Sequence, residues 1–120
     1  MLKVQAKTLG NIEVLTIYGQ IVNGETEILR NAVQSASEAS VIKLDLARVT
    51  TVDAGGLGVL LALREQAQSK GIRFELMNIT RQIARVFEIT RLDTVFQITS
   101  GVEFFPAGRA LRAAMTPRAA

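Results

Sequence analysis

The segment that most constrains this chain is residues 49–63, V-T-T-V-D-A-G-G-L-G-V-L-L-A-L. An alternating apolar run at residues 41–46 predicts a strand before it, and Asp53 followed by Gly55 and Gly56 predicts the start of an apolar helix. The first turn of a helix leaves backbone N–H groups unpaired and partly positive, so the Asp53 carboxylate can cap it. Two glycines would keep the turn narrow and bare, which would let a partner approach the backbone. These features are typical of a functional strand–helix joint, and an ordinary helix start has them too.

Size and composition predict one globular domain, because 48% of the 120 residues are hydrophobic. The longest apolar run, residues 54–63, has about half of the roughly 20 residues that a membrane-spanning helix needs. Residues 1–7 lack the long apolar region of a signal peptide, and there is no cysteine for a disulfide or a thiolate metal site. We therefore expect a cytoplasmic protein with no metal and no direct membrane insertion.

The charge and the missing histidine narrow the function classes. Without histidine the chain lacks the commonest general base and a frequent metal ligand, which disfavours most hydrolase and metalloenzyme schemes. The net charge is +3, and the last twenty residues hold +2 of it, from Arg109, Arg112 and Arg118 against Glu103. The rest of the chain is nearly balanced, so we expect no electrostatic nucleic-acid face.

Periodicity predicts the elements in the order β-β-α-β-α-β-α-β-α. The expected strands are residues 2–7, 12–18, 41–46, 72–77 and 95–98, and the expected helices are residues 25–36, 54–70, 82–91 and 107–115. Loops are expected at residues 19–24 and 49–53, and residues 116–120 are expected to fray. An α/β domain follows, with a small mixed sheet, an antiparallel hairpin before parallel strands, and about four helices. The carboxyl ends of the parallel strands, at Asp53 and residues 78–80, are the expected functional edge.

Helical spacing also predicts which side chains are buried, and several residues are expected to end helices. The expected buried faces are Ile28, Leu29, Ala32, Val33 and Ala36 in the first helix, Leu57, Leu60, Leu61 and Arg64 in the second, and Ile83, Val86, Phe87 and Thr90 in the third. Thr80 should cap the third helix, while Lys70 and Gly71 should end the second.

The chain resembles the STAS domain family, which comprises bacterial anti-sigma factor antagonists and cytoplasmic domains of sulfate transporters. The resemblance covers residues 4–98 and rests on Tyr18-Gly19, on I-K-L-D-L at residues 42–46 and on V-D-A-G-G-L-G at residues 52–58. Gly71-Ile72, L-M-N at residues 76–78 and F-E-I-T-R-L-D at residues 87–93 fit as well. It implies a STAS-like domain over residues 1–115 that works by binding proteins rather than by catalysis.

One departure from the family pattern concerns its regulatory switch. Antagonist members carry a serine or threonine after the aspartate, which a partner anti-sigma factor kinase phosphorylates, and this chain has Ala54 there. Gly55 replaces what is often a second hydroxyl residue. A phosphate would add roughly −1.5 to −2 charges beside Asp53 and repel a partner, and alanine cannot carry one. The chain is then either permanently competent to bind or regulated elsewhere, with Thr50 and Thr51 as alternative phosphorylation sites.

The resemblance implies that the partner-binding residues are Asp53, Ala54, Gly55, Gly56 and Leu57, which would dock on an anti-sigma factor of the serine kinase type. The alternative is an accessory subunit of a membrane transport complex, bound to another STAS or transport subunit. No cofactor is expected, although some family members are linked to nucleotide binding, which is a minor alternative here. The chain is expected to be a monomer or homodimer.

Other motifs favour structural roles. No dinucleotide or phosphate-loop glycine pattern occurs, and the carboxylates Asp45 and Asp53, expected near one strand end, lack other catalytic groups. Arg81 and Arg85 are spaced i, i+4 on a solvent face and could meet an acidic partner, although a solvated pair is the simpler interpretation. The pair at residues 104–105, Phe104 and Phe105, is expected in the core or a dimer contact.

Overall fold

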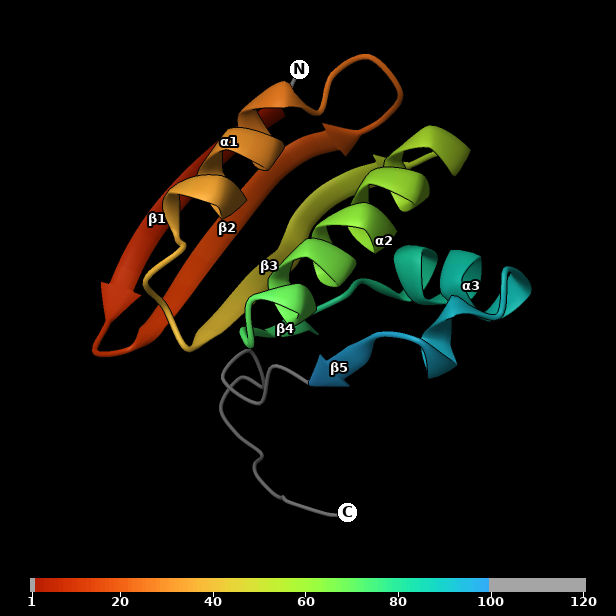
Figure 1. Ribbon diagram of the computed structural model, residues 1–120. Helices are drawn as coiled ribbons and strands as arrows, with labels where there is room; N and C mark the ends of the chain where they lie inside the picture. Colours follow the sequence, from red (N-terminus) through yellow and green to blue (C-terminus); the bar gives the residue numbers. More distant parts are fainter. Residues whose placement is uncertain (1, 100–120) are drawn as a thin grey trace, which may run out of the picture.

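The computed structural model describes residues 2–99 (Figure 1). Its elements are β1 (Leu2–Leu9), β2 (Ile12–Ile21), α1 (Glu27–Ser35), β3 (Val41–Val52), α2 (Ala54–Ser69), β4 (Arg73–Met77), α3 (Arg81–Ile89), the 3-10 helix η1 (Leu92–Thr94) and β5 (Gln97–Thr99). The predicted α/β order is confirmed as far as β5. The described residues contain three α-helices where about four were expected, and the predicted final helix, the 104–105 pair and the 116–120 tail lie outside them.

A five-stranded sheet in the order β1-β2-β3-β4-β5 forms the base of the domain. β1 and β2 form an antiparallel hairpin, and every later pair is parallel, as predicted. Because neighbouring strands follow chain order, right-handed crossovers place the connecting helices on one face of the sheet. Figure 1 shows α1 and α2 lying across that face. None of the helices within residues 2–99 has the length and apolar character that crossing a membrane requires.

The core lies between the sheet and these helices. Strands β2, β3 and β4 contribute fully buried side chains from alternating positions, including Leu15, Leu44 and Leu76. Phe87 from α3 is fully buried and stacks on Phe96 with ring centroids 5.6 Å apart. This stack fixes α3 and the approach to β5 against the sheet.

Strands β2 and β3 continue well beyond their predicted ends. The parallel ladder between β2 and β3 extends to the pair Ile21 and Val52, with register shifts on the way. The expected loop at residues 19–24 is therefore wrong as far as Ile21, and the one at residues 49–53 is wrong as far as Val52. Thr50 and Thr51 lie in β3 rather than in a loop. The reason is that backbone pairing with a neighbouring strand, and the bulges that accommodate it, decide where a strand ends.

Several side chains expected on buried helix faces are not buried. Ile28 is 46% exposed and Thr90 is exposed, because α1 buries mainly Leu29 and Val33 and α3 mainly Ile83 and Phe87. On α2 the expected Leu61 and Arg64 are only half-buried, and the buried face instead includes Val59, Leu63 and Ala67. The expected strand at residues 95–98 starts two residues late because Leu92–Thr94 form a 3-10 helix first.

Candidate docking site at the start of helix α2

The Asp53 carboxylate joins two loops at one end of the sheet. Its Oδ1 accepts a hydrogen bond from the Gly56 N–H at 2.8 Å, which confirms the predicted helix cap. Both carboxylate oxygens also lie 3.1 Å from the backbone nitrogen of Asn23, which donates from the loop between β2 and α1. The Asp53 N–H donates in turn to the Ile21 carbonyl at 3.3 Å. We call this set of contacts among Asp53, Gly56, Asn23 and Ile21 the Asp53 clasp.

The clasp stabilises the charged form of Asp53. Hydrogen bonds from the backbone N–H groups of Gly56 and then Asn23 lower the pKa of this carboxyl below its ordinary value, because they favour the carboxylate over the acid. The side chain is exposed, so its negative charge also faces solvent. The start of α2 therefore presents a fixed carboxylate.

The glycine pair has a different role from the one expected. A Cβ on Gly56 would lie 1.9 Å from the Ile21 carbonyl oxygen, and a Cβ on Gly55 would lie 2.6 Å from the Asn23 Cβ. Gly56 is buried, so the expectation of a bare backbone surface there is wrong: the segment that approaches it is the chain's own β2–α1 connection. Within α2 the open glycine is Gly58, where a Cβ would meet nothing within 4 Å.

Of the five residues predicted to bind a partner, Asp53 and Ala54 are exposed and Gly55 is half-buried. Gly56 and Leu57 are buried, and Leu57 anchors the helix to the core as expected. These residues are contiguous in the chain and lie at one corner of the domain, so the surface they can offer consists of Asp53, Ala54 and part of Gly55.

Sequence reasoning noted that the loop at residues 20–23 lacks the acidic residue frequent in the family, but it did not predict that this loop contacts Asp53. Asn23 and Gly24 are exposed, and Asn23 lies against both the Asp53 carboxylate and the position of a Gly55 Cβ. The Asn-Gly pair signals a turn, and Gly24 has a positive φ of 86°. That signal gives no information about a contact with residues thirty positions later.

The two threonines proposed as alternative phosphorylation sites end β3 close to the clasp. The Thr50 hydroxyl donates to the Gly19 carbonyl at 3.2 Å, so it fastens β3 to β2. Thr51 is exposed, and its backbone pairs with Gln20. Of the pair, Thr51 has the hydroxyl that the described structure leaves without a hydrogen bond.

The structure does not bring Asp45 and Asp53 together. Asp45 lies in the middle of β3, where its Oδ1 accepts from the Ala47 N–H at 3.1 Å and from the Asn78 side-chain amide at 3.2 Å. Eight residues of extended chain separate the two carboxylates, a span of about 25 Å. They therefore cannot act as a carboxylate pair on one small substrate, and residues 2–99 hold no cluster of three possible metal-ligating side chains.

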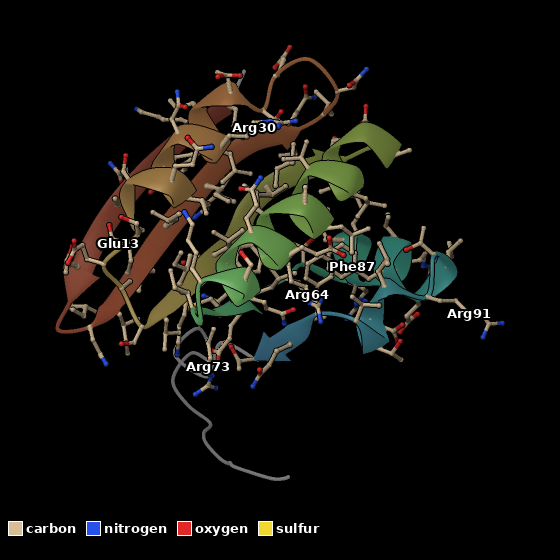
Figure 2. All side chains as sticks on the ribbon, in the orientation of Figure 1. Glu13, Arg30, Arg64, Arg73, Phe87 and Arg91 are labelled. Atoms are coloured by element: carbon tan, nitrogen blue, oxygen red, sulfur yellow. The ribbon has the colours of Figure 1, made fainter. Side chains whose placement is uncertain are left out.

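The arginines of α3 form a separate surface. Arg81 and Arg85 are exposed, as predicted, and Figure 2 shows Arg91 extending away from the fold beyond α3. Arg64 is half-buried on α2. Thr80 caps α3 by accepting from the Ile83 N–H at 3.2 Å, also as predicted.

Comparison with known proteins adds the wider context. A family model described as STAS domain matches residues 3–105. An anti-sigma factor antagonist from Mycobacterium paratuberculosis has 18% identity and a TM-score of 0.72, with 86% of this chain and 89% of that chain covered. An anti-sigma-factor antagonist (STAS) domain protein from Planctomyces limnophilus has 14% identity and a TM-score of 0.69, covering 83% and 92%. A sulfate transporter family protein from Wolinella succinogenes has 18% identity and a TM-score of 0.68, covering 77% and 79%. At these identities the solved structures show a common fold.

Proposed function

The chain belongs to the STAS domain family, and from that membership we propose that it is a protein-binding regulator of the anti-sigma factor antagonist kind. Its partner is an anti-sigma factor of the serine kinase type. The docking surface is centred on Asp53, Ala54 and Gly55, with the buried Gly56 and Leu57 holding it in place. It acts by occupying its partner, and no step of catalysis is assigned to it.

The observation that carries this proposal is the Asp53 clasp. It holds the β2–α1 loop and the start of α2 as one surface, in which a fixed carboxylate lies beside the small exposed side chain of Ala54. A surface that is already ordered loses little conformational entropy when it binds, which favours its use for recognition. Similar folds in two anti-sigma factor antagonists agree with this assignment.

In this proposal the docking surface is not regulated by phosphorylation at residue 54, as it is in the family pattern. Ala54 has no oxygen to accept a phosphate, so the negative charge that would repel the partner cannot be added there. The protein is then competent to bind whether or not ATP is available to the kinase.

The test compares two aspartate substitutions on the same helix. Wild type, Ala54→Asp and Ala62→Asp are used to capture partners from the cells that produce the protein, and the retained proteins are identified by mass spectrometry. Ala62 is an exposed α2 residue two turns from Ala54, so its variant adds the same charge away from the surface. We expect wild type and Ala62→Asp to retain an anti-sigma factor kinase and Ala54→Asp to lose it.

Two results would contradict the proposal. Equal retention of the kinase by both variants would place the docking surface elsewhere. Phosphate on Thr51 after incubation with the captured kinase and ATP would show that the switch has moved by three residues rather than been lost.

The second candidate is an accessory subunit of a membrane transport complex, bound through the same surface. The fold shared with a sulfate transporter family protein and the absence of a phosphorylatable residue at Ala54 favour it. Transport subunits among the proteins retained by wild type, with no kinase, would support this candidate in place of the first.

A further inference from the structure

The edge strand β1 has one side without a hydrogen-bonding partner among the described residues. All eight of its residues pair with β2, and no other strand within residues 2–99 pairs with it. In Figure 1 this strand forms the outer edge of the sheet beside α1. The opposite edge, β5, has three residues. A long edge strand presents a row of free N–H and C=O groups on which another strand can pair.

One face of β1 is basic. Leu2 is buried and Val4 half-buried on the helix side, so alternation places Lys3, Gln5 and Lys7 on the opposite face. Lys3 lies across from Tyr18 and Lys7 across from Val14, and within residues 2–99 neither lysine has a carboxylate at ion-pair distance. Two unpaired cations four residues apart thus lie about 13 Å apart along the edge.

The helix side of the same edge carries apolar side chains next to two carboxylates. Ile28 of α1 is 46% exposed and, with the buried Leu2 and with Glu25 and Glu27, lines an open hollow of about 400 Å³. Farther along the strand Ala6 is exposed, because the buried positions of β1 are confined to its start. A strand added outside β1 would place every second side chain on this side, against Ile28 and Ala6, where Glu25 and Glu27 disfavour a further carboxylate.

We propose that the free edge of β1 binds an extended segment of another protein, in which acidic residues alternate with apolar ones. The acidic side chains face Lys3 and Lys7, and the apolar side chains face Ile28 and the hollow beside Leu2. The backbone of the segment supplies the hydrogen bonds, and side-chain alternation supplies the selectivity.

Charge disfavours the symmetric pairing of two copies of the chain that is centred on Gln5. An antiparallel pairing of two β1 strands centred on Gln5 would set Lys3 of each copy against Lys7 of the other. Like charges directly opposite each other destabilise such a pair. Lysine on an edge strand discourages pairing in general, so the strand that binds here must bring carboxylates.

The test uses a blocked eight-residue peptide of alternating valine and glutamate, titrated into the isotopically labelled full chain and followed by amide NMR shifts and hydrogen exchange. We expect shifts on β1 and around Ile28, and slowed exchange of the β1 amides that face away from β2. Charge reversal by Lys3→Glu with Lys7→Glu should weaken binding about tenfold or more and should create binding of the matching valine–lysine peptide.

Two comparison variants make the outcome decisive. The double variant Arg81→Glu with Arg85→Glu changes the net charge equally on the exposed α3 surface and should bind the glutamate peptide like wild type. Ala54→Asp should also leave peptide binding unchanged, so failure at β1 is distinct from failure of the docking surface. Peptide shifts on α3, equal binding by both double variants, or dimerisation of the chain through β1 would overturn the proposal.

Discussion

Replacing Gly56 with alanine tests whether the clasp is built on direct backbone contact. The added Cβ would start 1.9 Å from the Ile21 carbonyl oxygen, although real Cβ contacts essentially never fall below 3.0 Å. The two segments would therefore have to separate by more than 1 Å. That movement breaks the 3.3 Å hydrogen bond from the Asp53 N–H to the same carbonyl and loosens the bonds from Asn23.

The magnitude follows from three terms. Overpacking costs about 1–3 kcal/mol, and each lost hydrogen bond costs about 0.5–1.5 kcal/mol. Alanine in a helix recovers about 1 kcal/mol relative to glycine. We expect Gly56→Ala to lower the free energy of unfolding by about 2–3 kcal/mol, which corresponds to a fall in Tm of roughly 10–20 °C for a domain of this size.

The matched control is Gly58→Ala, two positions later on the same helix. A Cβ there meets nothing within 4 Å, so only the helix propensity changes. We expect this variant to be more stable than wild type by about 0.5–1 kcal/mol. The two substitutions are chemically identical and have opposite predicted signs.

Urea unfolding followed by far-ultraviolet circular dichroism measures both variants, with the midpoint and slope fitted together. A Gly56→Ala protein as stable as wild type would refute the contact argument, because the β2–α1 loop would then yield without cost. An unstable Gly58→Ala protein would refute it equally, because steric contact would no longer separate the two sites.

Three further predictions concern other parts of the domain. Asp53→Asn should make the free energy of unfolding less dependent on pH in acid. Because the pKa of Asp53 is lowered in the folded state, its carboxylate stabilises the fold above about pH 4, and this effect is lost as the pH falls through the folded pKa. Wild type should therefore lose more stability than the variant in acid titrations. Phe87→Ala should cost about 3–5 kcal/mol in urea unfolding, whereas Ile89→Ala, at a side chain 74% exposed, should change stability by less than about 0.5 kcal/mol. Glu75→Gln should cost about 1–2 kcal/mol, because the buried carboxylate pairs with the Arg73 guanidinium and lies 3.7 Å from the Lys43 ammonium, and its loss leaves both cations without this partner. An unchanged urea midpoint would contradict this.

Local signals predicted the helix ends well. Asp53 and Thr80 cap their helices as expected, because an N-cap depends on a side chain and N–H groups two or three residues away. Gly71 follows α2 with a φ of 76°, again as expected. The antiparallel hairpin and the parallel direction of the later strands followed from the order of elements along the chain. These features are decided within a few residues or by general topology.

Contacts between distant segments were not predictable in the same way. The position of a Gly56 Cβ against the Ile21 carbonyl depends on how far β2 and β3 stay paired, and the ladder holds to Val52 through two register shifts. Burial of Ile28 depends on how α1 is rotated over the sheet, and the structure exposes this side chain while it buries Leu29 and Val33. A single sequence carries periodicity but not the register between strands.

The clasp explains how residue 54 can be alanine, without the hydroxyl of the family pattern, while the surface stays ordered. The clasp uses the Asp53 carboxylate and the N–H groups of Gly56 and Asn23, and no atom of the Ala54 side chain takes part. Ala54 is the first residue of α2 and is exposed, so its side chain can change without moving the two loops. Ala54→Ser should therefore keep the stability of wild type within about 0.5 kcal/mol and offer a phosphorylatable oxygen on an unchanged scaffold. If the captured kinase phosphorylates this variant and then releases it, the partner surface and the missing switch are both located at residue 54. If the kinase binds the variant but never phosphorylates it, residue 54 is not a phosphorylation site for this partner, as it would be for the kinase of an antagonist.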